Sequence, residues 1–532
     1  MRETTITTDK NNFVFPPRKP RSDRGDVVFT SCSRCFPIDT QAIRNKILDL
    51  AMRGKLTEQL PEDGSAEELY RQIQKEKQAL GKAGKIKKEK PLPEILEDDL
   101  PFEIPNNWRW GRLSDITSNL TLNDGDWVLS DDMDENGTVK LIQLGSIGDL
   151  QYRDKGFKHL TTQRFEMLNA KQIYPGYLLI NRMVADKMLL CILPEIEGVL
   201  ITAVDVCWVA PQKEYYDIKF LMYALASSGT QQKVKEVGYG VTRFRISKTN
   251  LVGVPFPFPP LAEQHRIVEK IEQTFSILDT IDALQTQYAD NLTVLKTKLL
   301  EAAIQGKLTD QLPEDGTAED LYRQIQAQKQ ALIQAGKIKK EKPLSEITAD
   351  EIPFEIPANW KWVRIGSIGI TVTGGTPSKA HPTYYGGSYP FFKPSDLDAG
   401  RHITKASEYL TEDGKNVSRQ LQQGSILVCC IGSIGKAAII DTTGTANQQI
   451  TALTPLESDS DYLLYAIASG AFQHQLEQGS RATTVSIINK SKFDNCILPL
   501  PPLAEQKRIV AKLDEVLEMI GQTPPRALRE KN

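Results

Sequence analysis

The sequence of 532 residues is poor in the residues that build metal and catalytic sites. It has five histidines, none close to another, and seven cysteines without a repeated spacing. Cys32 and Cys35 form a single CxxC, whereas a structural zinc site needs a second pair of ligands. Cys429 and Cys430 lie in an apolar run that predicts a buried strand. We therefore expect no zinc site, and the unpatterned cysteines favour a reducing, cytoplasmic location.

Long apolar runs and a large excess of one charge are also missing. No run approaches the roughly 18 residues that span a membrane, and the N-terminus lacks the apolar core of a signal peptide. The 65 basic and 68 acidic residues leave a net charge of -3, which argues against a protein that coats nucleic acid non-specifically. A specific DNA reader stays compatible with this balance, because local patches steer binding.

Motifs of enzymes that act on nucleotides or DNA are absent as well. Residues 432–436 read GSIGK, but they lack the spacing of a phosphate loop, and Ala437 replaces the hydroxyl residue that would hold magnesium. Gly-Ser-Ile-Gly occurs twice more, at 145–148 and 366–369, which favours a tight turn between strands. The Pro-Pro pairs lack the flanking residues of an adenine-methyltransferase motif. We expect no active site in this chain.

What the sequence does have is internal repetition. Residues 54–110 contain GKLTEQLPEDGSAEELYRQIQ, AGKIKKEKPL and LPFEIPNNWRW, and residues 306–362 repeat them almost letter for letter, at a period of roughly 252 residues. PPLAEQHRIV likewise returns as PPLAEQKRIV. Between these repeats lie two segments, 111–258 and 363–500, that barely resemble each other, although both read as mixed α/β. We expect both segments to share one fold.

The longest predicted helix runs from 261 to 305. Its apolar residues recur every three or four positions without an interrupting proline or glycine, so it could reach about 65 Å. Such a narrow stripe is typical of a helix with a coiled-coil partner, and two core helices with a bend are the alternative. A shorter helix at 39–54 resembles the missing second half of the last helix, 503–521. The chain therefore looks circularly permuted, and we expect these two end helices to pack side by side in a pseudo-twofold frame.

Two smaller features accompany the repeats. Ser65 and Glu68 form a capping box that opens a helix in the first repeat, and a KIKKEK run follows at 85–90 and again at 337–342. We interpret these runs as solvated faces, with DNA phosphates or an acidic partner as the alternative. Residues 1–38 are polar, lack periodicity, and are expected to be a disordered tail.

The clearest candidates for DNA-binding loops are the ends of the two variable segments, GYGVTRFRISK and GSRATTVSIINK. Arginines and hydroxyls in a glycine-bounded loop suit contacts with base edges or phosphates, and an ordinary surface loop is the alternative. Counting back from LAEQ aligns Lys248 with Lys490 and Arg245 with Ile487. The candidate DNA-binding residues are Thr242, Arg243, Arg245, Ser247, Lys248, Arg481, Thr483, Thr484, Ser486 and Lys490, together with Lys393 and Ser395.

Several motifs in a fixed order carry a family resemblance. PFEIPxNWxW, GGTPSKAHPTYYGG at 374–387, GSILVCCIGSIGKAAI, NQQI at 447–450 and PLPPLAEQ together resemble the specificity (S) subunit of type I restriction-modification systems, over residues 39–521. The resemblance implies a mixed α+β fold with two globular α/β target-recognition domains separated by long antiparallel coiled-coil helices. It also implies that each domain reads one half of a split, asymmetric site in double-stranded DNA.

The resemblance further implies partners. The repeated helices would bind two methyltransferase (M) subunits, and restriction (R) subunits would complete an ATP-dependent nuclease. S-adenosylmethionine, ATP and Mg²⁺ would then be bound by M and R and none by this chain, which would be non-catalytic. The candidate partner-binding residues are Ile267, Ile271, Leu292, Leu295, Leu299, Tyr70 and Tyr322.

The expected domains follow the chain order, with the recognition domains between helical segments. They are a tail at 1–38, a helix at 39–56, a spacer at 57–107, the first recognition domain at 108–260, the central helix at 261–306, a spacer at 307–359, the second recognition domain at 360–502, a helix at 503–522 and a tail at 523–532. Three alternatives remain open: a coiled-coil scaffold that reads no DNA, a subunit of a methyltransferase-only system, and a DNA-modifying enzyme in its own right.

Overall fold

The computed structural model describes residues 38–87, 92–96, 100–240, 244–480 and 487–520. Contacts divide the described chain between Gln287 and Tyr288 into two compact units, here called the first and the second unit. Each has its own buried apolar core. The division falls inside a helix, whereas the sequence suggested that the helix forms a segment of its own.

The first unit consists of helices and short strands in mixed order. Its helices are α1 (Thr40–Met52), α2 (Ala66–Lys82), α3 (Leu113–Ile116), α4 (Thr162–Leu168), α5 (Ile218–Ala226), α6 (Ser228–Val237) and α7 (Lys248–Gly253). Its strands are β1 (Arg109–Arg112), β2 (Leu122–Asp124), β3 (Val139–Ile142), β4 (Lys158–Leu160), β5 (Leu178–Asn181), β6 (Leu190–Ile192), β7 (Val199–Thr202), β8 (Val206–Val209) and β9 (Pro255–Phe258).

Helix α8 (Leu261–Ile304) is shared by the two units, and the second unit follows the same plan as the first. Its other helices are α9 (Ala318–Gln334), α10 (Glu412–Asn416), α11 (Ser460–Ala468), α12 (Gly470–Gly479), α13 (Lys490–Asn495) and α14 (Leu503–Met519). Its strands are β10 (Lys361–Arg364), β11 (Gly369–Thr373), β12 (Tyr385–Phe392), β13 (His402–Ile403), β14 (Glu408–Leu410), β15 (Ile426–Cys429), β16 (Ala437–Ile440), β17 (Thr445–Ala446), β18 (Ile450–Pro455) and β19 (Ile497–Leu500).

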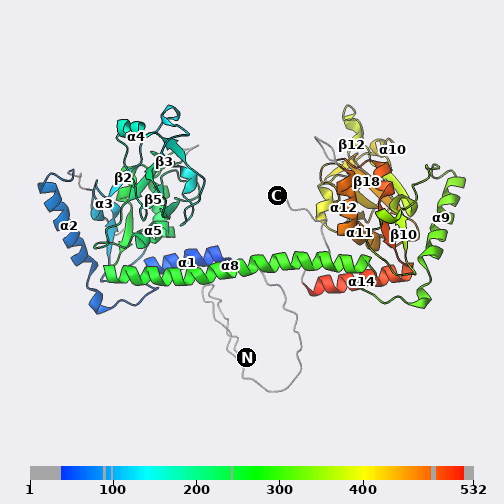
Figure 1. Cartoon of the computed structure of the whole chain (residues 1–532), viewed down its shortest axis with the longest axis horizontal. Helices are drawn as coiled ribbons and strands as arrows, with labels where there is room; N and C mark the ends of the chain where they lie inside the picture. The colour runs from blue at the N-terminus through cyan, green and yellow to red at the C-terminus, as the bar shows by residue number, and fades with distance from the viewer. Residues whose placement is uncertain (1–37, 88–91, 97–99, 241–243, 481–486, 521–532) are drawn as a thin grey trace, which may run out of the picture. The chain divides into compact units, whose positions relative to one another are not determined.

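The predicted long helix is confirmed as one element of 44 residues. In the first unit, α1 lies along the first part of α8 (Figure 1). Thr40 donates to Asp282 at 2.6 Å, while Gln59, beyond the other end of α1, donates to Glu263 at 2.9 Å. The N-terminal end of α1 thus lies beside a later part of α8, and the chain beyond the C-terminal end of α1 lies beside the start of α8. The two helices are antiparallel. Ile47 and Ala51 of α1 are buried in the core that α1 shares with α5, α6 and α8, whereas Ile43 is 39% exposed.

In the second unit, α14 lies along the last part of α8, as α1 does along the first part (Figure 1). Leu300 and Ile304 of α8 share one core with Ile509, Leu513 and Leu517 of α14. Each unit therefore pairs a helix of one repeat with half of α8. Helix α1 belongs to the first unit and α14 to the second, so the expected packing of these two helices against each other stays a prediction.

The two variable segments share one topology, as expected, except that β13 adds a fifth strand to the main sheet of the second unit. In the first unit a four-stranded antiparallel sheet has the order β2-β8-β5-β6, beside a three-stranded sheet β4-β3-β7. In the second unit the sheets are β11-β18-β15-β16-β13 and β14-β12-β17. A two-stranded pair, β1-β9 or β10-β19, closes each domain at the repeats. The sheet order is not the chain order, so residues distant in sequence meet at the strand ends.

The helical run near the end of the second variable segment is divided into two helices. The chain breaks between α11 and α12 at Ser469, whose hydroxyl accepts a hydrogen bond from the amide of Phe472 at 3.5 Å. Ser227 stands at the same break between α5 and α6. The serine side chain offers the backbone an alternative to helical bonding, which is why the helix divides there.

The repeated sequences form the same contacts in both units. The indole Nε1 of Trp108 donates to Glu263 at 2.8 Å, and that of Trp360 donates to Glu505 at 2.8 Å. Asp63 and Asp315 form ion pairs of 2.5 Å with Arg266 and Arg508 respectively. The LAEQ motifs therefore fix each recognition domain to its helices. The capping box of Ser65 and Glu68 is confirmed by reciprocal bonds of 3.3 and 3.4 Å.

Candidate nucleic-acid interface

Polar side chains of the first unit converge where three strands of the four-stranded sheet end. Asp124 ends β2, Arg182 follows β5, and Asp205 precedes β8. Arg182 Nε lies 3.2 Å from Asp124 Oδ1, and its Nη2 lies 3.9 Å from Asp205 Oδ1. Lys248, the first residue of α7, donates to Asn123 at 3.1 Å. We call this end of the sheet the rim of the first unit.

Most charge at this rim is neutralised within the protein. The side chain of Arg182 is 11% exposed and is held by its two carboxylates. Burial raises the pKa of Asp124, although the charges of Arg182 and Lys248 pull it down. The buried pair thus supports the rim and offers little to a ligand.

Arg245 is an exposed cation at this rim. Its backbone exchanges two hydrogen bonds of 2.9 Å with Tyr239, and its guanidinium carbon lies 5.3 Å from the Tyr239 ring centre. The residue that follows, Ile246, is buried and donates its amide to Arg182 O at 3.0 Å. No ion pair of Arg245 occurs among the described residues, so its donors are available to an external group.

The second unit has an equivalent rim with different chemistry. Ile488 is buried and donates its amide to Cys430 O at 2.8 Å, as Ile246 does to Arg182. The sequence alignment of Arg245 with Ile487 is therefore confirmed by the hydrogen-bond register. Ile487 forms a bridge to Ile431 and is 46% exposed. An apolar side chain stands where the first unit has a free arginine.

Amide side chains complete the second rim. Cys430 donates its amide to Gln449 O at 2.7 Å, and Arg182 makes the same bond to Asp205 O at 2.9 Å. Asn447 Nδ2 donates to Gln449 Oε1 at 3.0 Å, whereas the neighbouring Gln448 is exposed. The NQQI motif carries part of the family resemblance, yet sequence reasoning did not place these residues in the site. Their position follows from the strand order, which the sequence does not reveal.

The remaining described candidates differ in their availability. Lys490 is paired with Glu341 at 2.8 Å and with Asp494 at 2.7 Å, and Lys393 is paired with Glu408 at 2.9 Å. Ser247 caps α7 by accepting from the amide of Asn250 at 3.1 Å. Ser395 is exposed beside Lys393, at the end of β12. The other candidates, Thr242, Arg243, Arg481, Thr483, Thr484 and Ser486, lie outside the described residues.

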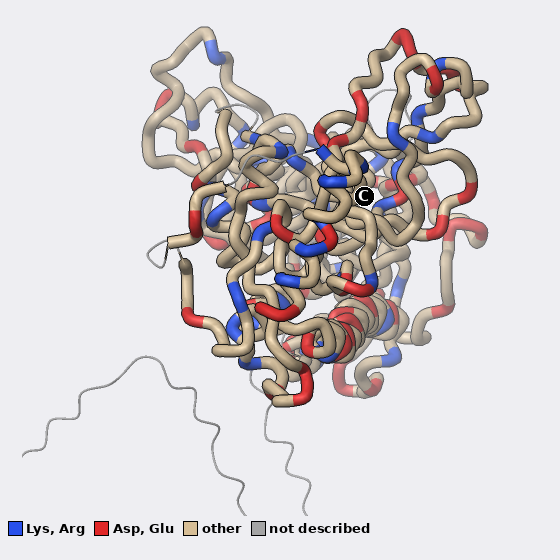
Figure 2. Tube along the Cα trace, turned by 90° about the vertical axis from the view of Figure 1, so that its left-hand side faces the viewer, with Lys and Arg blue, Asp and Glu red and all other residues tan. Residues whose placement is uncertain are grey.

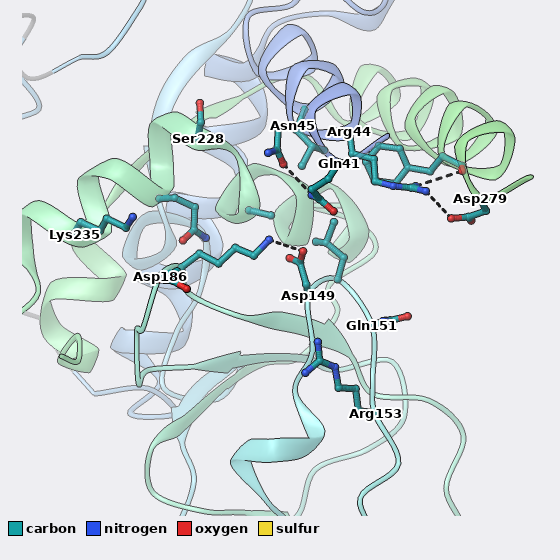
Figure 3. Close-up of a pocket in the computed structure, with 16 residues that line it drawn as sticks. Gln41, Arg44, Asn45, Asp149, Gln151, Arg153, Asp186, Ser228, Lys235 and Asp279 are labelled. Carbon is teal, nitrogen blue, oxygen red and sulfur yellow. Dashed lines mark hydrogen bonds and ion pairs between the residues drawn. The ribbon is translucent and has the colours of Figure 1, made fainter. Parts of the chain in front are cut away.

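A cleft of about 580 Å³ lies between α1, α6 and the loop at 149–153 of the first unit (Figure 3). Its charges are mixed: Arg44 pairs with Asp279 at 2.9 Å, and Lys187 pairs with Asp149 at 2.5 Å. Acidic and basic positions are likewise interspersed along the described trace (Figure 2). The cleft has no dominant charge to attract a polyanion.

The described residues give no sign of metal or membrane chemistry. Among them, no group of three or more His, Cys, Asp and Glu side chains could hold a metal ion. No described helix is long and apolar enough to cross a bilayer. Burial raises the pKa of the Cys207 thiol to about 12, and Cys429 and Cys430 are buried as expected. The Gly432–Gly435 sequence is a turn between β15 and β16, with positive φ angles of 81° and 87° at the two glycines.

The partner-binding candidates need one correction. Ile267 and Ile271 are 0% exposed in the core of the first unit, so they have no surface to offer a partner. Leu295 is 44% exposed, and Leu292 and Leu299 are half-buried. Tyr70 and Tyr322 are half-buried beneath Arg109 and Lys361. Sequence periodicity identified the apolar face of α8, but the part of that face with Ile267 and Ile271 is covered by the protein's own core.

Exposed apolar side chains mark a different face of the helices. Ile277 of α8 is 62% exposed, and Met519, its counterpart in α14 counted from LAEQ, is 77% exposed. Ile43 of α1 is 39% exposed, and its counterpart in α8, Leu295, is 44% exposed. Each unit thus presents the same two exposed apolar positions. Such equivalence is expected of a surface that meets two copies of one partner.

A family model decides the assignment. The model described as "Type I restriction modification DNA specificity domain" matches residues 105–287 and 357–524. The chain belongs to this family. Its two matched regions each hold one recognition domain and the helix that follows it. The sequence resemblance to specificity subunits, with two α/β domains and long helices, is confirmed.

Curated relatives of this family match along most of the chain. The EcoAI specificity subunit of Escherichia coli is 27% identical over 90% of this chain and 88% of its own length. The EcoEI specificity subunit of Escherichia coli is 26% identical over 91% of this chain and 90% of its own length. Both are named as specificity subunits of type I restriction enzymes, which agrees with a non-catalytic specificity subunit.

A solved structure shows the same fold. A chain from the "Structural basis underlying complex assembly and conformational transition of the type I R-M system" matches with a TM-score of 0.54 at 20% identity. It covers 79% of this chain and 93% of its own length. The mixed helix-and-sheet architecture is therefore a known fold.

Proposed function

We propose that this chain reads a bipartite DNA site for a type I restriction-modification complex. Each recognition domain reads one half of an asymmetric double-stranded site, and the helices bind two methyltransferase subunits. Restriction subunits complete the ATP-dependent nuclease. S-adenosylmethionine, ATP and Mg²⁺ act in those partners, in the cytoplasm, and none is bound by this chain.

The observation that carries the proposal is a contrast. The contacts that join each recognition domain to its helices are the same in both units, whereas the residues at the two rims differ. Trp108–Glu263 and Trp360–Glu505 hold the two domains in the same way. The rims at the equivalent strand ends differ, with Arg245 in one and Ile487 in the other. Two copies of one partner require the same helical frame in both units. An asymmetric DNA site requires two recognition domains with different DNA-binding residues.

The helix surface supports the binding of two methyltransferase subunits. Ile277 and Ile43 are exposed in the first unit, and Met519 and Leu295 are exposed in the second. Isolated apolar residues on a surface are common, but the same pair at repeat-equivalent positions favours a repeated contact. Val294 and Leu284, 52% and 58% exposed, extend the apolar surface of α8.

The test is a selection from random DNA with the chain bound to its methyltransferase subunits. We expect enrichment of one sequence with two specified blocks and an unspecified spacer, methylated on adenine. A scaffold that reads no DNA would enrich nothing, which would refute the proposal. Methyl transfer by the purified chain alone would instead favour an enzyme in its own right.

A further inference from the structure

One position of the rim carries opposite chemistry in the two units. Arg245 and Ile487 each precede a buried isoleucine whose amide donates to the residue after the central strand, Arg182 O or Cys430 O. Both side chains are exposed while their neighbours Ile246 and Ile488 are buried. Alternation along an extended segment therefore directs both side chains outward from the same place.

We propose that this position determines one base in each half-site: Arg245 reads a guanine, and Ile487 reads a thymine through its methyl group. The inference rests on the proposed function and adds the chemical identity of the base. It is restricted to the major groove, because only there are guanine and thymine presented with unlike groups.

The surroundings of Arg245 suit guanine. Its backbone is fixed by two hydrogen bonds to Tyr239, whose ring lies below the guanidinium at 5.3 Å. A guanidinium has parallel donors that match the adjacent O6 and N7 acceptors of guanine. Adenine offers N7 beside an amino donor, so it would leave one arginine donor unpaired. The ring contact limits the orientations of the guanidinium and so reduces the entropy lost on binding.

The surroundings of Ile487 suit thymine. Its cross-strand neighbour is the apolar Ile431. A base with a polar group at this point would lose hydrogen bonds to water without replacement. The C5 methyl group of thymine is the apolar feature of the major groove. Burying one such group contributes about 0.8 kcal/mol, which corresponds to about a fourfold change in affinity.

The experiment for Arg245 uses the complete complex with methyltransferase subunits and its selected DNA site. Each guanine in the half-site that changes when the first domain is exchanged is replaced in turn by 7-deazaguanine, which lacks the N7 acceptor. We expect one replacement to weaken binding by about tenfold or more. The same replacement should have no further effect on the Arg245→Ala complex, which is already weakened.

The matched control for this charge is Lys213→Ala. Lys213 is exposed beyond the opposite end of β8. Its replacement by alanine therefore removes a positive charge from the same unit but away from the rim. We expect equal responses to 7-deazaguanine in this variant and the wild type. If Arg245 instead contacts a phosphate, Arg245→Ala weakens the binding of all DNA sequences alike. In that case no single 7-deazaguanine replacement weakens the wild type more than it weakens Arg245→Ala. That result would overturn the assignment and leave bipartite reading intact.

The experiment for Ile487 replaces each thymine of the other half-site by uracil, which lacks only the methyl group. We expect one replacement to weaken wild-type binding by about fourfold and to have no effect on Ile487→Ala. The control is Val417→Ala, because Val417 is 58% exposed in the same unit at another place. Equal uracil sensitivity in Ile487→Ala and the wild type would refute the thymine assignment. Failure to select any bipartite site would refute the proposed function itself.

Discussion

Trp108 donates its indole Nε1 to Glu263 at 2.8 Å, and the carboxylate that accepts it is completely buried. Glu263 also accepts from Gln59 at 2.9 Å and from Thr57 at 3.3 Å. Neutral donors thus surround a buried acid that has no ion pair among the described residues. The arrangement ties the start of the recognition domain, the end of α1 and the start of α8 together.

Replacing Trp108 by phenylalanine removes one donor and leaves the buried carboxylate less satisfied. We expect a loss of about 1–3 kcal/mol in the free energy of unfolding, measured by urea titration. Trp360→Phe should produce a similar loss because Trp360 makes the same bond to Glu505. The control is Trp127→Phe, which alters a 68% exposed tryptophan and should change stability by less than about 0.5 kcal/mol. Equal effects of Trp108→Phe and Trp127→Phe would contradict this account.

The second unit contains a histidine whose charge state should influence stability. His402 Nδ1 lies 3.0 Å from Asp441 and Nε2 lies 2.8 Å from Asp461. Burial opposes the imidazolium, but hydrogen bonds and charges of the two aspartates outweigh it and raise the pKa of His402. Arg401 is the nearby cation, 3.2 Å from Asp461 and 2.7 Å from Asp514.

The raised pKa gives a definite sign. The stabilisation from charged His402 is fully present below the unfolded value of 6.5 and is lost as the pH rises through the folded pKa. We expect the melting temperature of the wild type to exceed that of His402→Gln at pH 6, and the difference to shrink by pH 8.5. A difference that grows with pH would contradict the sign. His381→Gln is the control, since His381 is exposed and has no ion pair among the described residues.

The helix surface makes a prediction about stoichiometry. Ile277→Asp places a charge in the exposed apolar surface of the first unit, and Met519→Asp does so at the equivalent position of the second. We expect each single variant to bind one methyltransferase subunit and the double variant to bind none with comparable affinity. Light scattering of the purified complexes would measure this. Leu120→Asp, at a 53% exposed position of the recognition domain, should still bind two subunits.

Some of this architecture follows from the sequence and some does not. The repeats predicted the paired contacts, because equal sequences between equal helices must pack alike. Periodicity predicted α8 but not which apolar residues are covered, so Ile267 and Ile271 were wrongly assigned to a partner surface. The sequence identified Arg245 and Lys248 of the rim. It could not identify Asp124, Arg182 and Asp205, because only the strand order β2-β8-β5-β6 brings them together from separate parts of the chain.

Exchange of one recognition domain should change one half of the DNA site. The structure places the best junctions outside β1 and β9, which pair with each other from Arg109 to Phe258. Residues 109–258 of a related specificity subunit would then bring both strands of the pair, while Trp108 and Glu263 are retained. We expect a new sequence in one block and no change in the other block or in the spacer, read from methylated genomic DNA. Altered sequence in both blocks would contradict independent reading.

Lengthening α8 tests whether this helix sets the spacing between the half-sites. Four residues inserted after Tyr288, where the neighbouring Ala289 and Asp290 are exposed, add about 6 Å to a helix. That length corresponds to about two base pairs at roughly 3.4 Å each. We expect the unspecified spacer to grow by one or two base pairs while both recognised blocks keep their sequences, because the rims are untouched. A four-residue insertion after Lys213, in a turn beyond β8, is the control and should leave the spacer as it was. An unchanged spacer in the α8 variant would show that the methyltransferase subunits, and not this helix, determine the distance.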